Sequence, residues 1–255
     1  MSAPVFLAEV GNLTGYDPGS QYVLDGAEAR HAGVVQRRRA GERIDVVDGQ
    51  GVRLECVIAA VEPGRLVLDV VGHSEESAPR VRLVLAQALA KGDRDELAIE
   101  AATEVGADEV VPWQAQRSVV VWRGERAAKS RARWLATVRQ ATKQARRARL
   151  PQVAHAVDTS GLAARVRAVV ADGGTAVVLD GAGAVPIADV PLPSGQQEAD
   201  VLVVVGPEGG VAEDELVVLA AAGAHVTRLG PTVLRTSTAG PVALALLAQR
   251  LGRWA

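Results

Sequence analysis

Cysteine, methionine and phenylalanine each occur once among the 255 residues, and lysine occurs three times against 25 arginines. The single cysteine, Cys56, excludes an internal disulfide and any zinc site built from several cysteines. Long apolar runs are also missing, since a run such as 201–205 is far shorter than the roughly 20 residues that cross a bilayer. The first fifteen residues carry no basic flank and no long apolar stretch. We therefore expect no signal peptide, no membrane contact and a cytoplasmic location.

Familiar nucleotide-binding and metal-binding motifs are absent as well. The sequence has neither the phosphate-binding loop G-x-x-x-x-G-K-[ST] nor a G-x-G-x-x-G turn between a strand and a helix. This argues against a kinase, a P-loop NTPase and an ordinary Rossmann dehydrogenase. The histidines lie far apart without the spacing of zinc ligands, so we expect no metal. They are His31, His73, His155 and His225.

The net charge of −2 hides an uneven distribution of charge along the chain. Residues 117–149 include eleven arginine and lysine residues and one acidic residue, Glu125. A second arginine-rich run spans residues 30–43. Clusters of this kind are typical of a protein with a polyanionic partner, although a plain solvated surface is the alternative. The arginines that we single out as RNA contacts are Arg37, Arg39, Arg117, Arg147 and Arg149.

Two regions with different patterns follow each other along the chain. Residues 1–72 contain short, β-branched segments separated by turn residues, which is typical of a small β-barrel. The polar stretch 73–79 ends in proline and is interpreted as a linker. Residues 80–255 alternate apolar strands with helices. This alternation predicts an α/β domain with a parallel sheet covered on both faces.

The same patterns place the individual elements. Strands are expected at 22–24, 43–47, 53–58, 65–71, 81–86, 109–113, 153–156, 176–179, 201–205 and 226–229. Helices are expected at 27–39, 95–105, 127–148, 213–222 and 238–251. In the helix 95–105, Leu97, Ala101 and Val105 recur at a spacing of four and are expected to share one face. The pair Asp48-Gly49 lies between two expected strands and predicts a hairpin.

Three loops of the second region each follow an expected buried strand and contain glycine. They span residues 179–183, 206–210 and 229–236. In open α/β sheets, ligands bind at the carboxyl ends of the strands, and glycine lets the main chain approach a ligand closely. Any one of these loops is more often a plain turn. Side by side, the three predict one pocket built mainly from main-chain atoms.

The residues of these loops resemble a known family. Gly206-Pro207-Glu208-Gly209-Gly210, followed by Leu229-Gly230-Pro231 and Leu234-Arg235-Thr236, is similar to the paired motifs of the RsmE family. That family consists of bacterial 16S rRNA uridine-N3 methyltransferases and belongs to the SPOUT superfamily. Lys91-Gly92-Asp93-Arg94 and Gln116-Arg117-Ser118-Val119 resemble further family segments, and residues 31–51 resemble the family's first domain. The resemblance therefore covers nearly the whole chain.

The resemblance implies a SPOUT domain at residues 80–255 that contains a trefoil knot and binds S-adenosylmethionine. It also implies a PUA-like, RNA-binding barrel at residues 1–72 and a homodimer that acts on 16S rRNA of the 30S subunit. Periodicity alone does not predict the knot, because knots are rare exceptions. For catalysis, the resemblance points to Arg235 and Arg147. The residues that it implies for the cofactor are Leu179, Gly181, Gly206, Pro207, Glu208, Gly209, Gly210, Leu229, Gly230, Pro231, Leu234, Arg235 and Thr236.

Methylation at N3 of uridine must remove the proton on that nitrogen. A side chain acting as general base and positive groups that stabilise the developing anion are both possible. Glu208 is the nearest carboxylate in the motifs, but it is more typical of a group that binds its own loop. Arg235 fits anion stabilisation, an RNA contact or a structural salt bridge. Trp122 and Trp134 are candidate base-stacking platforms, with core packing as the favoured alternative.

Three positions depart from the family pattern, namely Lys143, Arg146 and Ser237. We still expect the chain to bind the cofactor despite these departures. We assign no functional role to the side chains at the three positions. Two other functions stay open. One is a SPOUT methyltransferase that acts on tRNA or 23S rRNA, and the other is a non-catalytic RNA-binding assembly factor.

Overall fold

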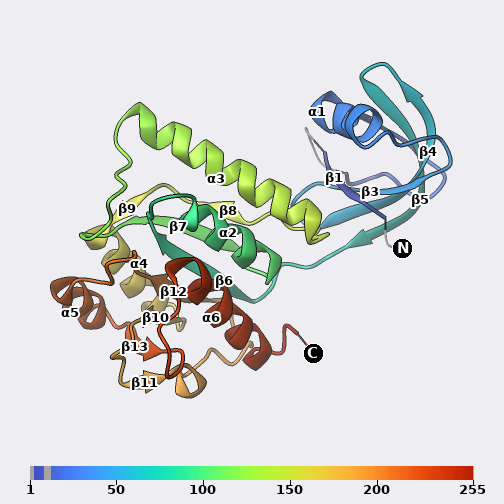
Figure 1. Ribbon diagram of the computed structural model, residues 1–255. Helices are drawn as coiled ribbons and strands as arrows, with labels where there is room; N and C mark the ends of the chain where they lie inside the picture. Colours follow the sequence, from blue (N-terminus) through green and yellow to red (C-terminus); the bar gives the residue numbers. More distant parts are fainter. Residues whose placement is uncertain (1–2, 9–12, 255) are drawn as a thin grey trace. The chain divides into compact units, whose positions relative to one another are not determined.

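The computed structural model describes residues 3–8 and 13–254, so parts of the N-terminal stretch considered above for a signal peptide lie outside it. The chain forms two compact units (Figure 1). Unit 1 contains residues 1–78 and 142–150, and unit 2 contains residues 79–141 and 151–255. None of the helices in the described part is long and apolar enough to cross a membrane.

Unit 1 is built on a five-stranded sheet with the order β1-β3-β4-β5-β2. The pairing is antiparallel except between β1 and β3. Apolar side chains alternate along β4 and β5, and their inward face forms one core with Phe6, Leu24 and Ile44. The elements are β1 (Val5–Leu7), β2 (Gln21–Asp25), α1 (Gly26–Arg30), the π-helical turn η1 (His31–Val35), β3 (Arg43–Val47), β4 (Val52–Glu62) and β5 (Arg65–Glu75).

The hairpin predicted at Asp48-Gly49 is confirmed between β3 and β4. The Asp48 carboxylate accepts hydrogen bonds from the N–H groups of Gln50 (2.7 Å) and Val52 (3.1 Å). Gly49 has a φ of +77°, a conformation that favours glycine. Turn chemistry therefore fixes the register of these two strands.

Two boundaries in unit 1 differ from the predictions. β5 continues to Glu75 because β4 is long enough to pair with it, so only residues 76–79 remain from the predicted linker 73–79. The helix predicted at 27–39 ends at Val35, after the π-helical turn. Arg37 then has a φ of +54°, which a helix does not accommodate.

Residues 142–150 belong to unit 1, although they begin in the last turn of α3 (Glu125–Gln144), most of which belongs to unit 2. Ala148 is buried against the strand residues Val5, Leu7 and Val47. The N–H of Leu150 donates to the carbonyl of Gly49 (2.9 Å). The division at residue 79 that the sequence suggests therefore leaves out this returning segment.

Unit 2 contains an eight-stranded sheet with the order β11-β13-β10-β12-β6-β7-β8, and β9 also pairs with β7. Every pairing in it is parallel, which confirms the predicted α/β class. The strands are β6 (Val81–Ala88), β7 (Glu109–Gln114), β8 (Gln152–Val153), β9 (Val157–Asp158), β10 (Thr175–Leu179), β11 (Val185–Pro186), β12 (Ala199–Val205) and β13 (His225–Arg228). The helices are α2 (Arg94–Glu104), α3 (Glu125–Gln144), α4 (Thr159–Ala171), η2 (Ile187–Asp189), α5 (Glu213–Ala221) and α6 (Thr236–Arg250).

The helices of unit 2 cover both faces of its sheet (Figure 1). α4 and α5 pack on one face, where their apolar side chains join those of β6, β10 and β12 in one core cluster. α2 and α6 pack against each other and contact β6. Successive residues of β6 therefore alternate between the two faces and are nearly all buried.

The buried face of α2 differs from the predicted one. Leu97 is 54% exposed, and Ala101 and Val105 are only partly buried. The side chains that face the core are Ala98, Ile99, Ala102 and Thr103. A spacing of four fits both sets in this alanine-rich helix, so the periodicity alone could not decide between them.

Three further predictions for unit 2 need correction. α3 ends at Gln144 rather than at 148, and Arg146 adopts a φ of +55° beyond its end. The strand predicted at 153–156 is replaced by the two short strands β8 and β9. α4 has no counterpart among the predicted helices, although Asp158 caps it by accepting a hydrogen bond from the N–H of Gly161 (2.8 Å).

Ion pairs collect at the amino ends of the central strands. Arg82 on β6 pairs with Asp200 on β12 (2.8 Å) and with Glu109 on β7 (3.2 Å). Arg165 also pairs with Glu109 (2.6 Å). These charges lie at the opposite end of the strands from the glycine-containing loops.

Candidate functional site

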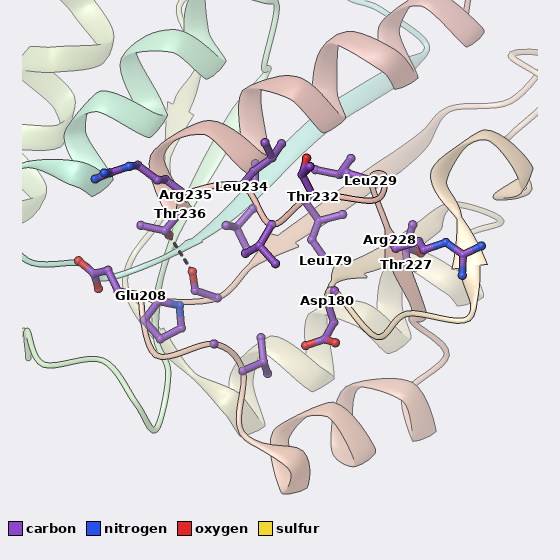
Figure 2. A pocket seen from close by; sticks show the side chains of 18 of the residues that line it. Leu179, Asp180, Glu208, Thr227, Arg228, Leu229, Thr232, Leu234, Arg235 and Thr236 are labelled. Atoms are coloured by element: carbon purple, nitrogen blue, oxygen red, sulfur yellow. Dashed lines mark hydrogen bonds between the residues drawn. The ribbon is translucent and has the colours of Figure 1, made fainter.

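A pocket of about 410 Å³ opens at the carboxyl ends of β10, β12 and β13 (Figure 2). Leu179 at the end of β10 is paired with Val205 of β12 and with Thr227 of β13, so the three strands end at one level. The loops that follow them therefore surround one space, and the first turns of α2 and α6 complete its wall. This is the arrangement of loops that the sequence predicts.

The loop after β12 is held in place by close main-chain packing. A Cβ atom on Gly206 would lie 2.7 Å from Cγ2 and 3.1 Å from the main-chain nitrogen of Val211. Gly210 has a φ of +74°, and its N–H donates to the carbonyl of Pro207 (2.9 Å). Glycine is therefore needed at 206 for space and favoured at 210 for conformation.

The loop after β10 is tied to β13 in the same way. The N–H of Asp180 donates to the carbonyl of Thr227 (2.9 Å), and the Asp180 carboxylate accepts from the N–H of Ala182 (2.8 Å). A Cβ atom on Gly183 would lie 2.6 Å from the carbonyl carbon of Thr227. A side chain at Gly183 would therefore push the two loops apart.

The loop after β13 connects to α6. Thr236, the first residue of that helix, is buried, and its hydroxyl donates to the carbonyl of Gly206 (2.7 Å; dashed in Figure 2). Arg235 is exposed, and no hydrogen-bond or ion-pair partner is found for its side chain among residues 3–8 and 13–254. In Figure 2 its side chain extends toward the side on which Glu208 lies, away from Asp180 and Arg228. Arg235 therefore offers an unengaged cation at the edge of the pocket.

Glu208 is held by the start of α2. One of its carboxylate oxygens accepts from Arg94 Nη1 (2.9 Å) and from the N–H of Lys91 (3.2 Å). Desolvation opposes ionisation, but the N–H of Glu208 itself and the bonds from Arg94 and Lys91 outweigh it, so the pKa of Glu208 is lowered. Glu208 is therefore an ionised, engaged loop carboxylate at neutral pH, which favours the structural interpretation over the general base.

The pocket brings together all but two of the residues predicted for the cofactor. Pro231 does not line it, and Gly209 lies against Arg117 instead, where an added Cβ would be 3.5 Å from the Cβ of that arginine. Sequence reasoning missed several lining residues, although most of them lie inside or beside the three loops. They are Arg94, Asp180, Val205, Val211, Thr227, Arg228, Thr232, Val233 and Ala239.

The structure separates the predicted RNA contacts into two kinds. Arg117 Nη1 donates to the carbonyl of Gly209 (3.0 Å), and Arg149 donates twice to the carbonyl of Glu76 (2.9 and 2.7 Å). These two arginines brace loops of their own units. By contrast, Arg37 and Arg39 are exposed, with no side-chain partner found in the described part of the chain.

Arg147 does not close a helix, because α3 ends before it. Its N–H donates to the carbonyl of Thr142 (3.0 Å), and it belongs to unit 1, whereas Arg235 belongs to unit 2. A shared catalytic role for the two arginines stays a prediction.

Other side chains have structural roles. Trp122 and Trp134 are buried and pack edge to face, with ring centroids 5.2 Å apart, so core packing is confirmed and the stacking platform is wrong. Lys143, one of the departures from the family pattern, pairs with Glu28 inside unit 1 (2.8 Å). Among the described residues, no group of three histidine, cysteine or acidic side chains is placed to hold a metal.

Comparisons with known proteins agree with this geometry. A family model described as RNA methyltransferase domain matches residues 76–248. "Ribosomal RNA small subunit methyltransferase E" of Mycobacterium bovis is 44% identical over 238 residues, which cover 93% of this chain and 90% of the relative. The Bacillus subtilis protein of that name is 29% identical over 231 residues, 89% of each chain. The Neisseria gonorrhoeae protein of that name, solved with S-adenosyl methionine, has a TM-score of 0.84 at 25% identity and 98% coverage of both chains.

Proposed function

The chain belongs to the ribosomal RNA small subunit methyltransferase E family, and from this premise we propose that it methylates N3 of one uridine in 16S rRNA with S-adenosylmethionine as donor. The observation that carries the proposal is the pocket at the ends of β10, β12 and β13, which residues of the two motifs of the family resemblance line. A second function, methylation of another RNA, has no observation that favours it.

The pocket fits S-adenosylmethionine by its construction. Its lining includes apolar side chains such as Leu179, Leu229 and Leu234 beside polar ones, and Gly206 leaves no space for a Cβ behind the loop. Such walls suit a ligand with a flat, partly apolar base and several hydrogen-bonding groups. When bound, the cofactor supplies an activated methyl group on its sulfonium. The two glycine-containing loops and the Thr236 turn would hold it.

The chain's own part in the chemistry is to bind and orient the uracil ring and to stabilise negative charge on it. The N3 proton passes to solvent, the negative charge left on the ring spreads onto the two flanking carbonyl oxygens, and N3 then takes the methyl group. Arg235 is exposed at the pocket edge and unengaged by any described residue, so it is suited to stabilise that charge. The bond from Arg94 to Glu208 supports a structural role for this carboxylate in its loop rather than the role of the base.

Unit 1 supplies part of the proposed RNA contact. Arg37 and Arg39 are exposed cations that suit phosphate groups, and the target base must leave its stack to enter a pocket. We assign the five-stranded sheet to the PUA-like class and the substrate to the 30S subunit. An RNA substrate of this kind implies a cytoplasmic location.

Unit 2 is proposed to be a SPOUT domain with a trefoil knot. The course of the chain supports this proposal, because after β13, on the outer side of β10, it returns to α6, which packs on β6 and β12. We also propose a homodimer. It is supported by Leu97 on α2 (54% exposed) and Leu246 on α6 (42% exposed), apolar side chains on two helices that pack together.

The test is methyl transfer from labelled S-adenosylmethionine to 30S subunits that lack the modification, followed by nucleoside mapping. We expect 3-methyluridine at one position. Cofactor binding without transfer to 30S subunits would point to another RNA substrate. Absence of both would favour a non-catalytic RNA-binding factor and refute the proposal.

A further inference from the structure

Gln87 is a fully buried polar residue at the carboxyl end of β6, directly below the pocket loops. Its side chain is 0% exposed, and it belongs to the face of β6 that α6 covers. The packing there is close, because a Cβ atom on Gly240 of α6 would lie 2.9 Å from Cδ1 of Leu85. An amide in such a place carries a desolvation cost unless it makes hydrogen bonds.

Gln87 begins a directed chain of hydrogen bonds. Its Nε2 donates to the hydroxyl of Thr236 (2.9 Å), and that hydroxyl donates to the carbonyl of Gly206 (2.7 Å). Because the amide can only donate through Nε2, the threonine hydrogen is left to point at Gly206. The chain thereby joins β6, the loop after β12 and the first turn of α6.

The polar atoms of the Gln87 amide are only partly satisfied by hydrogen bonds. Nε2 also donates to the carbonyl of Ala88 (3.2 Å), but no partner for the buried Oε1 is found among the described residues. A side chain selected only for stability at this position would be apolar, because an unpaired buried oxygen is destabilising. The residue is therefore better explained by what its donor does than by packing.

We propose that Gln87 is a positioning residue that, through Thr236, holds the two cofactor loops at the spacing that the bound ligand requires. Neither side chain needs to take part in methyl transfer. Gln87 does not line the pocket, and it acts only through the Thr236 hydroxyl and the Gly206 carbonyl. This inference rests on the proposed function, because the ligand it concerns is S-adenosylmethionine.

The test compares cofactor affinity with thermal stability in the full chain. Calorimetry with S-adenosylmethionine is run first on the unaltered protein and then on Gln87→Leu, which is close in volume and removes both the donor and the orphan oxygen. We expect the Kd to rise about five- to tenfold, as for the loss of one neutral hydrogen bond. The melting temperature should not fall, since the unpaired acceptor is removed as well. In turnover, KM for the cofactor should rise while kcat changes less than about twofold.

Three further variants make the test specific. Thr236→Val should weaken binding as Gln87→Leu does, and Thr236→Ser, which keeps the hydroxyl, should restore it. Thr175→Val is the matched control, because Thr175 is a buried strand threonine whose hydroxyl donates to the carbonyl of Pro191 (2.7 Å) away from the pocket. It should lower stability without changing the Kd.

The outcomes separate the inference from its premise. If the unaltered protein does not bind S-adenosylmethionine, the proposed function fails and the inference with it. If it binds, and Gln87→Leu and Thr236→Val bind equally well, the inference alone is overturned. A fall in melting temperature with an unchanged Kd in these variants would show a purely structural role and would also overturn it. Should Gln87→Leu not fold, Gln87→Met, which is also close to glutamine in volume and lacks the donor, replaces it in the same comparison.

Discussion

Adding a single methyl group at Gly206 is the perturbation for which the structure makes the clearest prediction. In Gly206→Ala, the new Cβ would lie 2.7 Å from Cγ2 of Val211 and 3.1 Å from its main-chain nitrogen. Side-chain rotation can relieve the first contact. The second involves the backbone, so the loop itself must move by a few tenths of an ångström.

Two effects follow, and their sizes differ. Overpacking of a tight site costs about 1–3 kcal/mol of folding stability. The displaced loop also carries the carbonyl that accepts from Thr236 and the N–H groups offered to a ligand. Loss of one or two such bonds, at about 1 kcal/mol each, corresponds to a weakening of cofactor binding by roughly five- to thirtyfold.

The assay is calorimetric titration with S-adenosylmethionine at a temperature where both proteins are folded, with Gly209→Ala as the matched control. Gly209 belongs to the same loop, yet its added Cβ would meet only Arg117, whose Cβ would be 3.5 Å away, which is ordinary contact. The control should bind within about twofold of the unaltered protein. Equal affinities for Gly206→Ala and Gly209→Ala would refute the reasoning, because the loop would then tolerate displacement.

Three other outcomes are expected. Arg235→Ala should lower the methyl-transfer rate more than about tenfold while the cofactor Kd stays nearly constant, as single-turnover assays and calorimetry can measure. Since the pKa of Glu208 is lowered from its usual 4.5, the stabilisation by its carboxylate is present above that value and is lost only as the pH falls through the lower, folded pKa. The pH–rate profile between about pH 6 and 8 should therefore be the same for Glu208→Gln as for the unaltered protein. If the rate of Glu208→Gln instead lost its dependence on pH in this range, Glu208 would be identified as a general base. Lys143→Met should destabilise unit 1 by about 3 kcal/mol in denaturant unfolding by leaving Glu28 buried without its partner, and adding Glu28→Gln should recover most of that loss.

The sequence was most informative where local chemistry decides the conformation. The pair Asp48-Gly49 predicted its hairpin, and the apolar segments predicted the parallel sheet. The three glycine-containing loops predicted one common pocket. The resemblance to the family is confirmed by relatives that match nearly the full chain.

What the sequence could not show depends on contacts between distant segments. The buried face of α2 is set by α6, and leucine at 97 stays exposed although it is the largest apolar residue of the predicted face. The return of residues 142–150 to unit 1 involves contacts with distant residues, such as the ion pair between Lys143 and Glu28, which are 115 positions apart. Gln87 escaped notice for the same reason, because a glutamine in an apolar strand becomes meaningful only once Thr236 lies beside it.

The glycines around the pocket also determine which mutational experiments can reveal their role. Alanine scanning works by deleting side chains, and at Gly181, Gly206, Gly210 and Gly230 there is no side chain to delete. At Gly206 and Gly183 the same scan adds an atom where 2.6–2.7 Å separates the new carbon from its neighbours. A library that enlarges small residues would therefore map this pocket more completely than one that truncates large ones. In a population of natural variants, losses of activity should therefore occur at these glycines as well as at Arg235.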